Sequence, residues 1–127
     1  METSLGFTGR LVCSLGVKDH KAAAEWYAGK LGCSVEFQSD DAGMSFMKTP
    51  VENVYLDLSQ VETPGVGGNA TMVWGVADAD AARKTLEEQG VRFDGATREF
   101  GGMVRLATFF DPDGNTMMVY QSLGSGG

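Results

Sequence analysis

The chain has 127 residues, 43% of them hydrophobic and 9% aromatic, which predicts one compact globular domain. A formal net charge of −7 and the lack of a basic stripe exclude nucleic acid and anionic membrane as partners. No apolar run reaches the length of a membrane span, and residues 1–4 lack the features of a signal peptide, so we expect a cytoplasmic protein. Cys13 and Cys33 fall at no metal or redox spacing and are expected to be free thiols.

The first half of the chain predicts one helix and four strands. The opening strand is expected over residues 10–17, after which Asp19 occupies the position of a helix N-cap. Apolar residues at helical spacing then predict a helix over residues 20–31, which Gly32 ends. Three further strands are expected over residues 35–38, 44–48 and 54–59.

The same order of elements restarts after residues 60–69, a loop rich in glycine that we interpret as a linker. Asp78 is the second predicted N-cap, and a helix follows over residues 79–89 until Gly90. The strands of this half are expected over residues 70–76, 91–93, 103–110 and 116–121.

Overlaying the two halves indicates an internal repeat. Val17-Lys18-Asp19 matches Val76-Ala77-Asp78, and Gly32-Cys33 matches Gly90-Val91, with an offset of 58 or 59 residues. The chain therefore predicts two βαβββ modules. Their expected bounds are residues 9–59 and 70–121, with flexible ends at residues 1–8 and 122–127.

Two motifs add a family resemblance to this repeat. The first helix ends Trp26-Tyr27-Ala28-Gly29-Lys30-Leu31-Gly32, and the last hairpin contains Phe109-Phe110-Asp111-Pro112-Asp113-Gly114-Asn115. With the two modules, these motifs resemble the vicinal oxygen chelate superfamily of glyoxalases, bleomycin-resistance proteins and extradiol dioxygenases, over residues 9–121. The resemblance implies an α+β fold in which two tandem βαβββ modules form a curled mixed sheet around a cavity, usually in a homodimer. Whether the modules pair within one chain or between two chains stays open.

Metal-using members of that superfamily carry His, Glu, His and Glu at four strand positions. The motifs place these positions at Val12, Asp57, Thr71 and Met118, with Leu56 as the alternative to Asp57. A catalytic metal needs about three converging ligands, and the chain has one histidine, His20, expected to be exposed on a surface helix. We therefore expect no bound metal and no cofactor.

Strand alternation separates an apolar side from a mixed side. The apolar side is expected to pack on the helices and contains Cys13, Leu15, Val17, Leu56, Leu58, Met72, Trp74, Val76, Met117 and Val119. The mixed side contains Val12, Ser14, Gly16, Tyr55, Asp57, Ser59, Thr71, Val73, Gly75, Thr116, Met118 and Tyr120. With one charge in that set, the mixed side is typical of a ligand site, in which Gly16 and Gly75 leave room. The alternative is that Val12, Val73 and Met118 fill a core.

The candidate ligand-binding residues are Val12, Ser14, Tyr55, Asp57, Thr71, Val73, Met118, Tyr120 and Arg105. Asp57 either accepts hydrogen bonds from a ligand or bonds Ser14, Ser59 or Tyr120. Tyr55 and Tyr120 either stack on a planar ligand or pack within the fold. Arg98 and Arg105 either close over an anionic ligand or remain solvated.

These patterns favour a metal-free protein that binds and sequesters a small molecule, similar in type to bleomycin-resistance proteins. One alternative is a lyase, isomerase or dioxygenase of the same superfamily with a non-standard or metal-independent site, for which Asp57 and Tyr120 are the catalytic candidates. Another is an accessory domain without a ligand.

Overall fold

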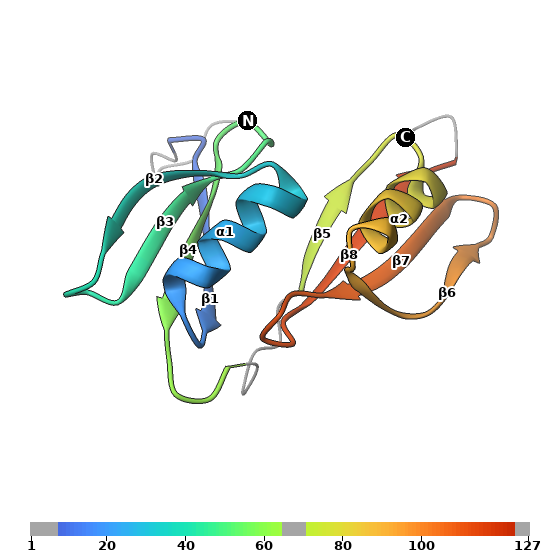
Figure 1. The fold of residues 1–127 in the computed structure, drawn as a ribbon. Coiled ribbons are helices and arrows are strands. Elements are labelled where there is room, and N and C mark those ends of the chain that lie inside the picture. The colour runs from blue at the N-terminus through green and yellow to red at the C-terminus, as the bar shows by residue number, and fades with distance from the viewer. Residues whose placement is uncertain (1–7, 65–70, 124–127) are drawn as a thin grey trace. The chain divides into compact units, whose positions relative to one another are not determined.

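The computed structural model describes residues 8–64 and 71–123. The chain divides after Pro64 into two compact units, which we call the first and the second module. Each contains one helix and one four-stranded sheet (Figure 1). The α+β class and the two βαβββ modules that the repeat predicts are thus confirmed. Residues 65–69 of the predicted linker and most of the predicted flexible ends lie outside the described residues, while Gln60 belongs to a strand.

The first module follows the predicted order of elements. They are β1 (Leu11–Val17), α1 (His20–Leu31), β2 (Ser34–Ser39), β3 (Met44–Lys48) and β4 (Val54–Gln60). The sheet order is β1-β4-β3-β2, in which β1 runs parallel to β4 and the other neighbours are antiparallel. The turn before β4 uses Asn53, whose positive φ of 66° suits a tight turn between the strands.

The second module repeats this topology. Its elements are β5 (Met72–Gly75), α2 (Ala79–Glu88), β6 (Arg92–Phe100), β7 (Val104–Phe110) and β8 (Thr116–Ser122), in the sheet order β5-β8-β7-β6. The predicted strand over residues 91–93 was too short, because β6 continues past an interruption. The register with β7 shifts between Asp94 and Arg98, and Gly95 in this stretch has a φ of 70°. The bulge breaks the alternation on which the prediction relied.

Both helices begin with the same hydrogen bonds. The predicted N-caps are confirmed: Asp19 accepts bonds from backbone N–H groups of α1 at 3.0 and 3.1 Å, and Asp78 accepts one from α2 at 3.0 Å. The first N–H of each helix donates to a glutamine on the module's last strand, Gln60 at 3.2 Å and Gln121 at 2.9 Å. These glutamines, which the sequence patterns did not indicate, tie each helix start to its sheet.

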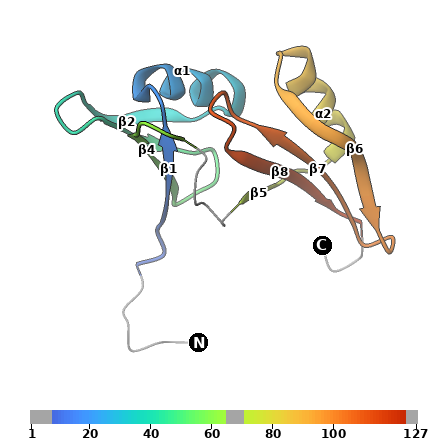
Figure 2. The same ribbon diagram turned by 90° about the horizontal axis from the view of Figure 1, so that it is seen from below.

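Each helix covers one face of its own sheet (Figure 2). The buried apolar residues of the first module are Val17, Ala23, Ala24, Tyr27, Cys33, Met47, Leu56 and Leu58. Those of the second are Ala79, Leu86, Val91, Ala107, Phe109, Met117 and Val119. The strand residues among them belong to the predicted apolar side or share its alternation, so the opposite face of each sheet is free of its helix. In the described ranges, no helix is long and apolar enough to cross a membrane.

Candidate functional site

The helix-free face of the first module brings four predicted site residues together. Strand pairing places Val12 beside Tyr55 and Ser14 beside Asp57 on the parallel strands β1 and β4. On the other side of β4, Lys48 pairs with Tyr55 and Phe46 pairs with Asp57. We use the name Asp57 face for the following set of residues: Arg10, Val12, Ser14, Phe46, Lys48, Tyr55, Asp57 and Ser59.

The carboxylate of Asp57 is held by two serine hydroxyls. Ser14 Oγ donates to Oδ2 at 3.3 Å and Ser59 Oγ donates to Oδ1 at 2.8 Å. The intramolecular bonds to these two serines, one of the predicted alternatives, are therefore present. Because a carboxylate oxygen accepts more than one hydrogen bond, and Asp57 is only half-buried, it can still accept a bond from a ligand.

An aromatic pair lies beside this carboxylate. The rings of Phe46 and Tyr55 stack with centroids 5.4 Å apart and planes 7° from parallel. The guanidinium carbon of Arg10 lies 4.3 Å from the centroid of the Tyr55 ring. Phe46 and Arg10 were missing from the predicted site, although the alternation in β3 places Phe46 on the same face as Lys48.

The helix-free face of the second module is more apolar. Val73 pairs with Met118 across β5 and β8, and Thr71 is exposed just before β5. Tyr120 pairs with Gly75, where an added Cβ would meet the tyrosine ring at 3.2 Å. The room that Gly75 was expected to leave for a ligand is thus used by Tyr120.

The matching glycine of the first module behaves similarly. An added Cβ at Gly16 would meet the side chain of Val61 at 3.0 Å. Both glycines therefore accommodate a neighbouring side chain of their own module, which differs from the expected open space.

Arg105 does not share a face with the other candidates. It lies on β7 with the alternation of the buried Ala107 and Phe109, and it pairs with Asp80 of α2 at 3.1 Å and Glu99 of β6 at 2.9 Å. The hydrogen bond to Glu99 raises the pKa of the Arg105 guanidinium, and the charges of neighbouring carboxylates act in the same direction. The two ion pairs explain why the charged side chain of Arg105 lies on the helix side of its sheet and not on the ligand side.

The residues do not fit a catalytic metal. In residues 8–64 and 71–123, no group of three or more His, Cys, Asp or Glu side chains is placed to hold an ion. At the four positions that the resemblance implies for a metal, the valine, threonine and methionine side chains offer at best weak ligands, and the carboxylate of Asp57 accepts hydrogen bonds from two serines. The cysteines are free, and burial raises the pKa of the Cys33 thiol to about 11.

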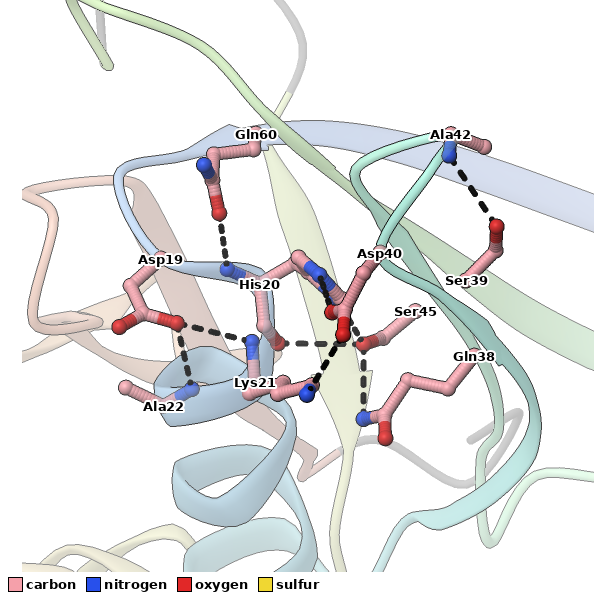
Figure 3. Close-up of polar contacts among 10 residues, drawn as sticks. All are labelled: Asp19, His20, Lys21, Ala22, Gln38, Ser39, Asp40, Ala42, Ser45 and Gln60. Carbon is pink, nitrogen blue, oxygen red and sulfur yellow. Dashed lines mark hydrogen bonds and ion pairs between the residues drawn. The ribbon is translucent and has the colours of Figure 1, made fainter.

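His20 is buried, contrary to the expected exposure on a surface helix. Its side chain extends from the start of α1 toward Asp40 and Ser45 of the β2–β3 hairpin (Figure 3) and has only 5% of its surface exposed. Nδ1 lies 2.8 Å from Ser45 Oγ and Nε2 lies 3.1 Å from Asp40 Oδ1. The prediction failed because helical position alone does not reveal polar partners that a distant hairpin supplies.

This chain of Asp40, His20 and Ser45 contains the residue types of a hydrolase triad, yet its geometry is structural. The serine is fully buried, so no substrate reaches its Oγ. The same Oγ accepts a bond from Gln38 Nε2 at 2.9 Å and donates to the His20 carbonyl at 3.2 Å. The cluster anchors α1 to the hairpin and leaves the Asp57 face as the site with accessible chemistry.

Comparisons with known proteins agree with the fold. Residues 9–119 match the family model described as "Glyoxalase/Bleomycin resistance protein/Dioxygenase superfamily". A search of curated protein sequences found no match.

Three solved structures illustrate the range of similar folds. A superfamily member from Sphaerobacter thermophilus DSM 20745 is 24% identical, with a TM-score of 0.77, covering 93% of this chain and 100% of that one. An antibiotic binding protein from Streptomyces sp. CB03234 is 25% identical, with a TM-score of 0.74, covering 93% of this chain and 98% of that one. A lactoylglutathione lyase from Agrobacterium tumefaciens is 15% identical, with a TM-score of 0.73, covering 91% and 95%.

Proposed function

The chain belongs to the Glyoxalase/Bleomycin resistance protein/Dioxygenase superfamily, and from this premise we propose that it is a metal-free protein that binds and sequesters a small organic molecule. The observation that carries the proposal is the Asp57 face, where a half-buried carboxylate lies beside stacked aromatic rings. Apolar surface with a few oriented polar groups is the composition of a small-molecule site. The 25% identity to an antibiotic binding protein supports the same function.

The candidate residues of the second module belong to the proposal as a separate candidate surface on their own sheet. Val73 and Met118 supply apolar area, and Thr71 and Tyr120 supply hydroxyls. Arg105 is left out, because its two ion pairs lie on the other side of the sheet. We further propose that the protein is cytoplasmic and forms a homodimer. Sedimentation velocity tests the dimer, and a species of 13.5 kDa at every concentration would contradict it.

An enzyme of the same superfamily is the competing function. A metal-dependent lyase, isomerase or dioxygenase is disfavoured by the side chains at the metal positions. A metal-independent acid/base catalyst would need Asp57 or Tyr120 within about 3 Å of a substrate proton. We keep this function as an outcome of the experiment below.

A thermal-shift screen tests the proposal. The purified protein is heated with aromatic antibiotics, thiol conjugates, small acids and divalent metals, because a ligand that binds only the folded state raises the melting temperature. We expect a shift with an organic compound and none with metals. The shift is expected to fall in Asp57→Ala and to persist in Glu25→Ala, which removes an exposed carboxylate from α1. A shift that requires a metal, or turnover of the bound compound, would favour the enzyme.

A further inference from the structure

The charge that the Asp57 face presents to a ligand can be assigned from its contacts. Among the described strand residues that pair in register on this face, Asp57 is the only carboxylate; Glu36 lies at the bulge of β2, where the pairing with β3 shifts, and is not part of this count. Both of its hydrogen-bond partners, Ser14 and Ser59, are neutral hydroxyls, and no positive side chain in residues 8–64 and 71–123 forms an ion pair with it. A hydrogen-bonded but uncompensated carboxylate favours a cationic partner.

The adjacent aromatic ring already accepts a cation. The guanidinium of Arg10 lies over the ring of Tyr55 at 4.3 Å, and no ion pair with a described residue holds Arg10 there. The electron-rich face of an aromatic ring attracts positive charge, and this attraction grows when water is excluded. Arg10 is exposed and precedes β1, so it can leave the ring without breaking a strand.

Carboxylate and rings are close enough to bind one molecule. Tyr55 and Asp57 are alternate residues of β4, and Phe46 pairs directly with Asp57 while stacking on Tyr55. Phe37 lies on the edge strand β2, pairs with Phe46 of β3 and is 57% exposed. It extends the aromatic surface to the edge of the sheet. A flat ligand can therefore cover the rings and place a charged group at the carboxylate.

We propose that the ligand of this face is an organic cation, in which an ammonium, amidinium or guanidinium group is attached to a planar aromatic part. This inference rests on the proposed binding function and specifies its ligand class. The positive group pairs with Asp57, and the aromatic part stacks on Tyr55 and Phe46, displacing Arg10. The net charge of −7 raises the local concentration of cations around the protein.

An anionic ligand is the main alternative to the proposed organic cation. Lys48 pairs with Tyr55 across β3 and β4, and together with Arg10 it supplies two positive side chains near the ring. An anionic ligand would use these cations and would meet the carboxylate of Asp57 as a repulsive neighbour. Variants at Asp57 and Arg10 shift the two classes of ligand in opposite directions.

Three tricyclic probes of similar shape separate these possibilities at neutral pH. They are 9-aminoacridine, which is a cation, acridine, which is neutral, and acridine-9-carboxylate, which is an anion. We expect fluorescence titration to give the cation an affinity about tenfold above that of acridine, as one charge-assisted hydrogen bond provides. The anion is expected to bind most weakly. In Asp57→Asn the affinities for 9-aminoacridine and acridine should differ by no more than about twofold. The control Glu25→Gln, which removes an exposed carboxylate from α1, should retain the preference for the cation.

A second variant keeps the test decisive if Asp57→Asn folds poorly. Arg10→Gln removes the resident cation from the Tyr55 ring at an exposed position. We expect it to strengthen binding of 9-aminoacridine and to leave acridine-9-carboxylate weak. Preference for the anion, weakened further by Arg10→Gln, would overturn the assigned charge. Equal binding of all three probes would also overturn it while leaving the binding function intact, and failure of all three to bind would count against both proposals.

Discussion

The two modules share one chain path but fix their helices with different side chains. In the first, His20 opens α1 and reaches Ser45 and Asp40 of the β2–β3 hairpin. In the second, the matching position is Ala79, a fully buried residue without polar side-chain atoms. There Arg83 on the next turn of α2 takes over, donating to the Gly95 carbonyl at 2.8 Å and to a nearby threonine.

This difference separates what defines the module from what can vary. The aspartate cap, the glutamine from the last strand and the apolar side of the sheet occur in both modules, so they are the common requirements of the βαβββ unit. The polar link between helix and hairpin is replaceable, and so is the helix-free face. That face carries a carboxylate bonded to two serines in the first module and mainly Val73, Met118 and Tyr120 in the second. We therefore expect ligand charge to be selected by the first module.

The largest effect is expected for His20→Ala, which makes the first helix start like the second. The change removes a buried ring and two hydrogen-bond partners of the hairpin, so it should lower the free energy of unfolding by about 3 kcal/mol. Each module carries one of the chain's two tryptophans, Trp26 in α1 and Trp74 in β5. Urea unfolding followed by each tryptophan, with the other replaced by phenylalanine, measures the loss. Glu25→Ala on the exposed side of α1 is the control.

If the loss after His20→Ala were below about 0.5 kcal/mol, the cluster would not anchor the helix. If Trp74 reported a larger change than Trp26, the anchor would act outside its own module, and the contrast drawn between the modules would fail.

A smaller effect is expected for Arg83→Met, which removes the corresponding link of the second module. Methionine keeps the apolar contact with Phe93, over which the guanidinium lies at 4.7 Å, but leaves the Gly95 carbonyl and a threonine hydroxyl without their donor. We expect a loss of about 2 kcal/mol, reported by Trp74. Lys84→Met, at the exposed neighbouring position, should be nearly neutral; equal losses in both variants would show that charge or propensity, not the link, is responsible.

The glutamine that bonds the helix start occurs in both modules, so replacing it should lower the free energy of unfolding equally in each. Gln60→Ala and Gln121→Ala each leave the first N–H of a helix without its acceptor, so each should cost about 1 kcal/mol in the same unfolding experiment. Gln60→Glu and Gln121→Glu keep the acceptor and add a negative charge at a helix N-terminus, and should retain stability. A loss confined to one module would remove the glutamine from the common requirements.

The sequence predicted those features that local chemistry determines. Asp19, Asp78 and Gly32 act within one turn of their own helix, and alternation within β1 and β4 correctly placed Ser14 and Asp57 on one face. The same alternation predicted the buried strand residues Leu56, Leu58, Met117 and Val119, whereas Cys13, Leu15, Met72 and Trp74 of the predicted apolar side are only half-buried.

The features that it missed depend on contacts between distant segments. His20 looked like an exposed helix residue because Ser45 lies 25 positions away, and β6 looked short because the bulge near Gly95 breaks its alternation. Arg10 and Phe46 entered the site only when strand register brought them to Tyr55. The register between strands cannot be predicted from the sequence of one strand alone.

The smallest expected effect is a pH dependence confined to the anchor of the first module. The hydrogen bond from Lys21 lowers the pKa of Asp40 below its ordinary value of 3.8, and a bond from His20 adds to this shift. The hydrogen bond between Lys21 and Asp40 also raises the pKa of Lys21 above its ordinary value of 10.5. Asp40 therefore contributes stability above pH 3.8 that is lost as the pH falls through its lowered pKa. Lys21 contributes stability below pH 10.5 that is lost as the pH rises through its raised pKa.

Urea unfolding of the wild type and of Asp40→Asn across this range, followed by Trp26, isolates the contribution. The variant should be less stable than the wild type near neutral pH, and the two should converge in acid, where the wild-type carboxyl is also uncharged. Asp41→Asn, at the next exposed position, controls for the general effect of removing a negative charge. A constant difference between Asp40→Asn and the wild type down to the lowest pH would mean that Asp40 acts through its shape and not its charge.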